Sequence, residues 1–330
     1  MEAFSPSDLK TILHSKRANL YYLEHCRVLV KGGRVEYVTD EGNRSLYWNI
    51  PIANTTTVLL GTGTSITQAA MRELAKAGVM VGFCGGGGTP LYAGNEIEWL
   101  SPQSEYRPTE YLQHWVRFWF DDGLRLEAAK EFQLVRLKRT QEHWLHNRVL
   151  CEQGFKADSA GLGSAMQGAS NAIVSAGDNV HLLTEEAHLT KQLYRLACAA
   201  TGYGEFTRAA RGESADAANR FLDHGNYLAY GLGATAAWVL GLPHGLAVLH
   251  GKTRRGGLVF DIADLVKDAI ILPQAFLSAM RGHGEQEFRQ HCIEALVRSE
   301  SLDFMIDTVK ATALAMGKKA ALQAQYSVQP

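Results

Sequence analysis

The chain has 330 residues, of which 46% are hydrophobic, and its 33 basic and 34 acidic side chains give a net charge of -1. Because single hydrophobic cores stop growing near ~250 residues, a chain of this length is expected to form two domains. The balanced charge excludes a protein that coats nucleic acid through a uniformly basic surface, although a neutral total can contain a local basic groove.

The composition also bears on where the protein works. The N-terminal sequence MEAFSPSDLK has no basic segment followed by an apolar one, so no secretion signal is predicted and the cytoplasm is expected. The five cysteines lack CxxC spacing and are expected to be reduced packing residues. Residues 225–251 contain no Asp, Glu, Lys or Arg, but their small residues and Pro243 predict a buried helix that ends near Gly241, not a membrane span.

Residues 1–104 are predicted to form a small β-rich domain. NLYYLEHCRVLVKGGRVEYVTD places β-branched and aromatic residues around KGG, which indicates strands joined by a tight turn, and SLYWNIPIANTTTVLLG continues this pattern. TSITQAAMRELAKAG predicts a helix capped at Thr64 or Ser65 and closed by Gly78, with the strand VMVGF after it. The segments LLGTGTSITQ and FCGGGGTP lack the GK[ST] of a phosphate-binding loop and are interpreted as turns and caps.

The segment SPQSEYRP, which ends at Pro108, is interpreted as a linker to a larger all-α domain over residues 109–330. The fold class is therefore α+β. Helical periodicity is found over residues 109–148, 183–200, 214–241, 258–271 and 285–315. The Gly/Ser/Ala-rich residues 158–178 are predicted to be a mobile connection.

The helix predicted at 109–148 interleaves aromatic and basic side chains. Aromatic residues at helical spacing are more often core than a platform for nucleobases, and its basic residues are usually solvent-facing. Arg136 and Arg139 are nevertheless candidates for contacts with DNA phosphates.

Acidic side chains cluster on two helices of the second domain. On a helical wheel, Asp261, Asp264 and Asp268 fall on one side of the segment that follows residue 257, where like charges repel by ~0.2 to 0.5 kcal/mol per pair unless something positive lies nearby. Glu186 falls within the apolar arc of its own helix, so its carboxylate must be neutralised, hydrogen-bonded or bound to a cation. The alternative for both segments is that these acids complement a helix N-terminus and are solvated.

An imidazole and a basic loop complete this pattern. His250 and the carboxylates supply a ligand set that suits Mn²⁺ or Mg²⁺ better than a structural zinc ion. The loop residues Lys252, Arg254 and Arg255 would hold phosphates beside such an ion, which is the usual apparatus of phosphodiester chemistry.

The same residues carry a resemblance to a known family. Glu186 ahead of Tyr194, the N-x-x-L of residues 219–222, the sequence GLPHGLAVLH ending in His250, and LVFDIADLVK with Asp261 and Asp264 resemble the CRISPR-associated protein one family. The likeness covers nearly the whole chain, and EEAHLTKQLY and LDHGNYLAYGLGA are most similar to its type I-F branch. Asp268 lies outside the family pattern and is expected to be a surface or supporting acid.

The resemblance implies a function and partners. Members are integrases and metal-dependent DNA nucleases that bind duplex DNA with single-stranded 3′ ends and insert it into the CRISPR repeat array by transesterification. They form an asymmetric homodimer through the β-rich domains. They act with the CRISPR-associated protein two, which in the I-F branch is usually fused to the interference helicase-nuclease. The implied metal ligands are Glu186, His250 and an acid of the last motif, with Asp261 favoured and Asp264 binding directly or through water.

Three other interpretations remain open at this stage. The first is a DNA-binding scaffold without catalysis, and the second is a metal-dependent phosphoesterase of small substrates. The third is an integrase of a mobile element, which would use the same chemistry.

Overall fold

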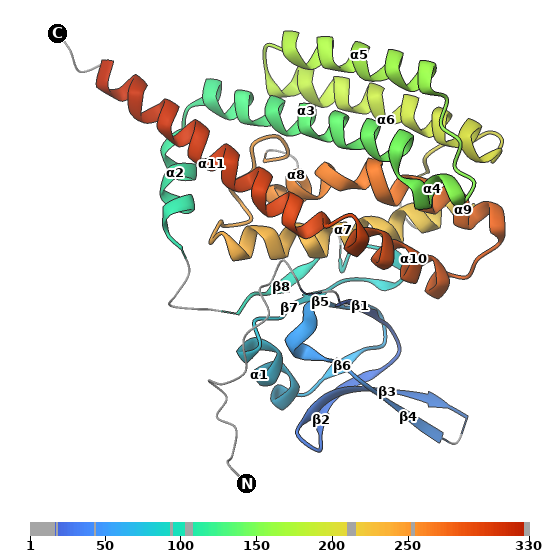
Figure 1. The fold of residues 1–330 in the computed structure, drawn as a ribbon. Helices are drawn as coiled ribbons and strands as arrows, with labels where there is room; N and C mark the ends of the chain where they lie inside the picture. Colours follow the sequence, from blue (N-terminus) through green and yellow to red (C-terminus); the bar gives the residue numbers. More distant parts are fainter. Residues whose placement is uncertain are drawn as a thin grey trace.

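The computed structural model describes Arg17 and residues 19–42, 44–92, 95–102, 108–209, 216–251 and 255–326. Two small sheets form the N-terminal part, and a bundle of helices stacks above them (Figure 1). None of the described helices is both long enough and apolar enough to span a lipid bilayer. The α+β architecture predicted from the sequence is confirmed.

The N-terminal part contains an inner and an outer sheet of four strands each. The inner sheet has the order β1-β5-β7-β8, formed by Asn19–Leu23, Thr55–Leu60, Met80–Phe83 and Glu98–Leu100; only β8 is antiparallel to its neighbour. The outer sheet has the order β4-β3-β2-β6, formed by Arg44–Asn49, Arg34–Glu41, Arg27–Lys31 and Ser65–Ile66. The predicted KGG turn is confirmed, because Gly32 and Gly33 join β2 to β3 with positive φ angles of 57° and 77°.

The helix of the N-terminal part, α1, spans Gln68–Lys76. Thr67 caps it by accepting a hydrogen bond from the Ala70 N–H, so the predicted cap at Thr64 or Ser65 is wrong. The physical reason is that Ser65 and Ile66 are extended as β6, which pairs with β2. Gly78 follows the end of α1 with a φ of 69°, as predicted.

The helical part is built from long helices that cross one another. In chain order they are α2 (Glu110–Trp119), α3 (Asp122–His146), α4 (Arg148–Glu152), α5 (Ser159–Ser175), α6 (Asn179–Thr201), α7 (Ala217–Val239), α8 (Gly257–Val266), α9 (Leu272–Arg281), α10 (Glu285–Arg298) and α11 (Ser301–Tyr326). A π-helical turn over Lys267–Ile271 joins α8 to α9. The helix predicted over 109–148 is therefore broken near Phe120, because Asp121 caps α3 by accepting from Leu124 N.

The predicted mobile connection over 158–178 is wrong. Most of it is α5, which Asp158 caps by accepting from the N–H groups of Ala160 and Gly161. Leu162, Met166 and Ile173 bury its apolar face. Small residues suggest flexibility when they are considered alone, but Ala and the cap favour a helix once one face is buried.

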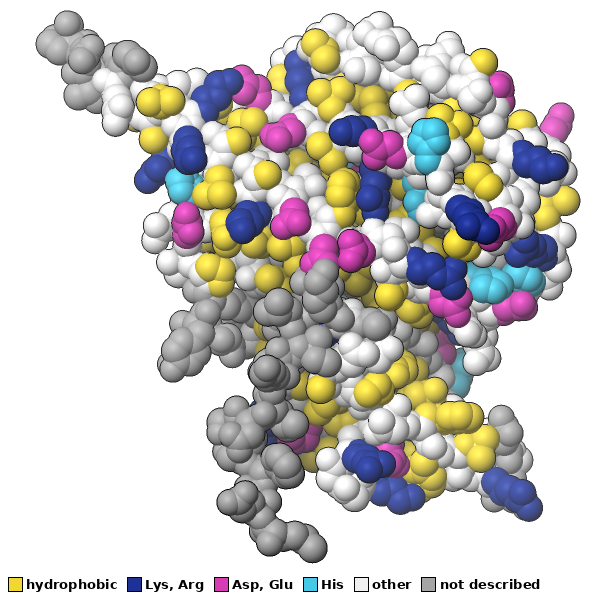
Figure 2. Space-filling view, in the orientation of Figure 1, with side chains coloured by type: hydrophobic (Ala, Val, Ile, Leu, Met, Phe, Trp, Pro, Cys, Tyr) yellow, Lys and Arg dark blue, Asp and Glu magenta, His cyan; other side chains and the backbone are white. Residues whose placement is uncertain are grey.

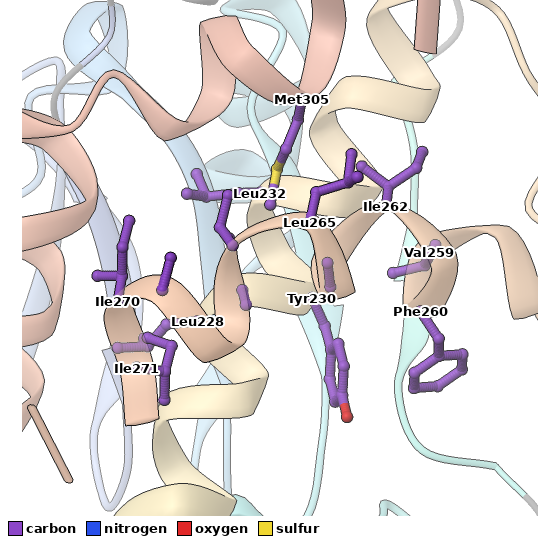
Figure 3. Packing of buried hydrophobic residues seen from close by; sticks show 14 of the residues in the cluster. Leu228, Tyr230, Leu232, Val259, Phe260, Ile262, Leu265, Ile270, Ile271 and Met305 are labelled. Carbon is purple, nitrogen blue, oxygen red and sulfur yellow. The ribbon is translucent and has the colours of Figure 1, made fainter. Parts of the chain in front are cut away.

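Helix α7 is the centre of the fold. Almost every residue along it is buried, and Figure 3 shows its Leu228, Tyr230 and Leu232 among side chains of α8 and α11. The inner sheet packs on its other side, where the hydroxyls of Thr57 on β5 and Thr235 on α7 lie 2.7 Å apart. The sheet and the helices thus share one core, and the division into domains at residues 104 and 109 stays a prediction.

Candidate metal site

The candidate site lies where α6, α8 and the loop between α7 and α8 meet. Among the described residues, Glu186, His250 and Asp264 form a group of possible metal ligands whose ligand atoms all lie within 4.8 Å of one another. His250 Nε2 is 3.5 Å from Glu186 Oε2, and His250 Nδ1 is 3.9 Å from Asp264 Oδ2. Residues that are distant in the sequence therefore converge, as the sequence predicted for Glu186 and His250.

Asp261 has a different position from the other acids. Its Oδ2 accepts hydrogen bonds from the backbone N–H groups of Val248 and Leu249, and its Oδ1 accepts from the N–H of His250. The same Oδ1 lies 2.8 Å from His250 Nδ1. With both oxygens already bonded and the side chain 1% exposed, Asp261 is poorly placed to bind an ion. The geometry favours Asp264 as the direct ligand, which reverses the order predicted from the sequence.

The bond between Asp261 and His250 fixes the imidazole. Because an ionised carboxylate can only accept, Nδ1 carries a hydrogen, and in the neutral ring Nε2 presents its lone pair towards Glu186. Burial alone would lower the pKa of His250, but the hydrogen bond to Asp261 and the charges of Asp264 and Glu186 raise it above the ordinary value. The ring is therefore both oriented and made a stronger base.

Two further side chains hold the backbone that carries His250. The indole of Trp119 donates to the carbonyl of Ala247 over 2.7 Å, and the amide of Asn179 donates to the carbonyl of Val248 over 2.8 Å. No sequence pattern points to Asn179, because a lone Asn at a helix start usually serves as a cap. The C-terminal end of α2 and the N-terminal end of α6 thus fix the loop just before His250.

Asp264 is balanced by a lysine one turn away on the same side of the chain. Lys267 pairs with Asp264 Oδ1, and its ammonium lies 5.5 Å from the centre of the Tyr230 ring. Burial would raise the pKa of Asp264, but the charges of Lys267, His250 and Arg136 together lower it. Asp264 is consequently ionised.

Arg136 does not lie on the surface, so its predicted contact with DNA is wrong for this structure. The residue is 3% exposed, and its guanidinium donates to Glu186 Oε1 over 2.7 Å and to Asp268 Oδ2 over 2.6 Å. Asp268 is 7% exposed and is not a surface acid. A helical wheel could have shown this, because Arg136 lies four residues from Phe132 and eight from Trp144 on the buried stripe of α3.

The other predicted phosphate contacts have mixed outcomes. Arg255 is exposed at the start of α8, whereas Lys252 and Arg254 lie outside the described residues. Arg139 is half-buried, donates to the carbonyl of Ser299, and lies 4.4 Å from the centre of the Phe304 ring. On the face seen in Figure 2, the basic side chains of the helical part are interspersed with acidic ones.

The charge balance of the cluster shows what could bind there. Its members are four carboxylates and two permanent cations: Glu186, Asp261, Asp264, Asp268, Arg136 and Lys267. With a neutral imidazole, two negative charges remain uncompensated in a poorly solvated place. Burial, and after it the nearby Asp264, raises the pKa of Glu186 above its ordinary value. A divalent cation with oxygen and imidazole ligands fits this set.

Comparison with known proteins gives an independent result. A family model described as CRISPR associated protein Cas1 matches residues 20–295. A CRISPR-associated endonuclease Cas1 of Pseudomonas aeruginosa (strain UCBPP-PA14) is 69% identical over 317 residues, which cover 95% of this chain and 98% of that protein.

Solved structures resemble the fold as a whole. A TtCas1–DNA complex has a TM-score of 0.63 at 23% identity and covers 89% of this chain and 91% of its own. A casposase bound to an integration product has a TM-score of 0.69 at 15% identity and covers 91% of each chain. At these identities the likeness concerns the arrangement of sheets and helices.

Proposed function

The chain belongs to the CRISPR associated protein Cas1 family, and from that premise we propose how its own residues perform the chemistry of a CRISPR adaptation endonuclease and integrase. We propose that Glu186, His250 and Asp264 hold one Mg²⁺ or Mn²⁺ ion, and that Asp261 orients His250. The observation that carries this proposal is the convergence of three ligand groups in a cluster with two surplus negative charges.

When bound, the ion would polarise a phosphoryl oxygen of DNA and make a 3′-hydroxyl, or water in the nuclease reaction, a better nucleophile. The protein then needs no nucleophile of its own. Its residues keep one imidazole lone pair and two carboxylates directed at one point, and the bonds of Asp261 prevent the ring from turning away. The raised pKa of His250 means that the proton on Nε2 must leave before this nitrogen can act as a ligand.

Variants of the three ligands test this proposal. Glu186→Gln, His250→Ala and Asp264→Asn are each expected to lower DNA integration and cleavage with Mn²⁺ by more than about a hundredfold, because a metal ligand is removed. DNA affinity should be kept or should rise, since the carboxylate variants remove negative charge. Asp307→Asn, which changes an exposed acid on α11, is the matched control. Turnover near the level of this control in any of the three would refute the ligand set.

We also propose that the loop of residues 252–255 holds DNA phosphates beside the metal site. Arg255 is exposed where α8 begins, close in sequence to His250, and this supports the proposal. Replacing Lys252, Arg254 and Arg255 with Ala should weaken DNA binding and flatten its dependence on salt, by about 0.9 in log–log slope for each phosphate that the protein no longer neutralises. Binding would be titrated between about 50 and 200 mM salt, with Lys138→Ala on the exposed side of α3 as the control. An unaltered slope would mean that DNA runs elsewhere.

The rival interpretations predict other results. A catalytically inactive scaffold would bind DNA but would not integrate it in Mn²⁺, whereas a small-molecule phosphoesterase would cleave a generic phosphoester and leave DNA intact. The presence of all the acceptor groups weighs against the scaffold. The likeness to a casposase concerns the fold alone, so an integrase of a mobile element is not favoured over a CRISPR enzyme by any residue described above.

We propose a homodimer formed through the outer sheet. Strand β4 ends the order of this sheet and pairs with β3 on one side, so its other edge is open among the described strands. Tyr47 and Trp48 on β4 are 47% and 49% exposed. An open edge with large exposed aromatic residues is suited to pairing with a second copy. The further partner, CRISPR-associated protein two fused to a helicase-nuclease, rests on the family resemblance.

A further inference from the structure

Arg136 is an extensively bonded side chain beside the candidate metal site. Its guanidinium donates to Glu186, to Asp268, to Gln133 Oε1 over 3.1 Å and to Thr190 Oγ1 over 3.3 Å. These acceptors come from α3, from α6 and from the π-helical turn after α8. One buried group therefore joins three elements beside the site, of which α6 also carries the candidate ligand Glu186.

Asp268 contacts Arg136 from an irregular part of the helix. The turn Lys267–Ile271 is π-helical, which inserts an extra residue into the helical path and moves side chains off the regular wheel. The carbonyl of Asp268 accepts a hydrogen bond from the buried indole of Trp144 over 2.9 Å. The backbone of Asp268 is thus held by Trp144 while its side chain binds Arg136.

The two oxygens of Glu186 have different surroundings. Arg136 binds Oε1 at 2.7 Å, whereas Oε2 lies 3.5 Å from His250 Nε2, on the side of the candidate ligands. A guanidinium so close would also cancel much of the charge that Glu186 offers to an ion. Asp268 opposes this effect, because its Oδ2 lies 2.6 Å from Arg136 Nε and 2.5 Å from Nη2.

We propose that Arg136 and Asp268 are a pair of positioning residues, in which Arg136 holds Glu186 by one oxygen and Asp268 offsets the charge of Arg136, so that Glu186 can bind a divalent cation. This inference rests on the proposed metal site. It assigns to Asp268 a role in metal affinity although Asp268 is not itself a ligand. The pair acts as a unit, and its effect on the ion depends on the two charges being present or absent together.

Charge-matched variants distinguish this role from a merely structural one. Asp268→Asn keeps the shape of the side chain but leaves one positive charge of Arg136 uncompensated, so the cluster has one surplus negative charge where the wild type has two. The double variant R136Q/D268N removes both charges and restores the original surplus. The double variant also removes the hydrogen bond from Arg136 to Glu186, so its recovery measures the charge offset by Asp268. A purely structural role predicts that the double variant is at least as impaired as the single one, whereas the charge offset predicts recovery.

Mn²⁺ binding to the full-length protein, measured by calorimetry and by the electron paramagnetic resonance of the ion, provides the test without catalysis. Asp268→Asn is expected to weaken Mn²⁺ binding about tenfold or more, and R136Q/D268N to regain most of that affinity. Asp307→Asn, an exposed acid on α11, should bind like the wild type. Circular dichroism checks that each variant is folded. If Asp268→Asn does not fold, the test relies on R136Q/D268N alone, whose Mn²⁺ affinity should be within about threefold of that of the wild type.

Two results would overturn the inference, and a third separates it from the proposed site. If Asp268→Asn binds Mn²⁺ with the same affinity as the control Asp307→Asn, then Arg136 and Asp268 have no role in metal affinity. The charge argument is refuted if R136Q/D268N binds Mn²⁺ no more tightly than the folded single variant. It is also refuted if the double variant binds Mn²⁺ more than about tenfold more weakly than the wild type. If Glu186→Gln binds Mn²⁺ as well as the wild type does, the metal site itself is misassigned and this inference falls with it.

Discussion

At the scale of single residues, the protonation of His250 determines how the metal-free protein responds to pH. Its pKa in the folded state is raised, so protonation favours folding. This stabilisation is fully present below the pKa of an exposed imidazole, about 6.5, and disappears as the pH rises through the higher folded value. The free energy of unfolding can be measured by urea denaturation with a metal chelator present. The difference between the wild type and His250→Gln, wild type minus variant, should become smaller as the pH rises from about 6 to 8. A difference that grows with pH would contradict the assigned environment.

The same proton has the opposite effect on metal binding. A protonated Nε2 cannot be a ligand, so Mn²⁺ affinity should increase over the interval in which the apo protein loses this stabilisation. His250→Gln should show a shallower dependence on pH, because the proton that competes with the ion for Nε2 is no longer present.

The residues of the site differ in how far a sequence can assign their roles. Glu186 can be found because a carboxylate in an apolar arc requires a partner. Asp261 and Asp264 lie three residues apart on one side of α8, so no wheel separates them, and only the loop that places three N–H groups on Asp261 shows the difference. Arg136 is wrongly predicted to contact DNA when all basic residues of α3 are assumed to face solvent. Of Arg136 and Arg139, only Arg136 lies on the buried stripe of this helix.

At the scale of elements, periodicity predicts most helices and fails where local chemistry decides. The break before α3 depends on one aspartate cap, and α5 depends on burial of three residues in a segment whose small residues suggest mobility. The π-helical turn has no signature in a single sequence, because an inserted residue looks the same as a regular helical one.

Close helix crossing gives a prediction at this scale. At Gly233 on α7, a Cβ atom would lie 2.8 Å from the carbonyl oxygen of Val259 on α8, which is backbone and cannot rotate away. Gly233→Ala should therefore destabilise the protein by about 1 to 3 kcal/mol and lower integration, because α8 carries Asp261 and Asp264. Urea denaturation and the plasmid integration assay provide the measurements.

Gly168 is the matched control for this variant. It also lies within a helix, α5, but a Cβ there would meet nothing within 4 Å. Gly168→Ala should stabilise the protein by about 0.5 to 1 kcal/mol, because alanine has less freedom to lose on folding. If the two variants have equal stabilities, the crossing of α7 and α8 is looser than the contact implies.

At the scale of the whole molecule, the glycine-rich segment of residues 85–88 joins the sheets to the helices. The N–H of Gly87 donates to Glu24 Oε1 over 2.8 Å, and that of Gly88 donates to the hydroxyl of Tyr22 over 3.1 Å, so these donors are already used. A Cβ at Gly88 would lie 2.6 Å from the backbone of Asp223 on α7. The sequence predicts that these glycines form turns. It does not predict that they contact Glu24, Tyr22 and Asp223, which lie in distant segments.

Assembly provides the last prediction, and it concerns the outer sheet because this sheet lies farthest from the helical bundle (Figure 1). The ring of Trp48 stacks on that of Tyr37 with centroids 6.4 Å apart, and the ammonium of Lys31 lies 3.3 Å from the centre of the Tyr47 ring, so each ring has a partner within the sheet. Tyr47 and Trp48 are successive residues of β4 and therefore lie on opposite faces of the sheet beside its open edge. Introducing charge by Tyr47→Glu with Trp48→Glu should leave the fold intact, since both side chains are half-exposed, but should repel a second copy that pairs along β4.

Light scattering after size exclusion should then show a mass near that of the 36.2 kDa chain for this double variant and about twice that mass for the wild type. Met280→Glu on α9, where the side chain is 48% exposed, adds charge to another apolar surface and should leave the dimer unchanged. Because the candidate metal cluster is built within a single chain, the monomeric variant should still bind Mn²⁺ with wild-type affinity. A double variant that remains dimeric would place the contact on a different surface from β4.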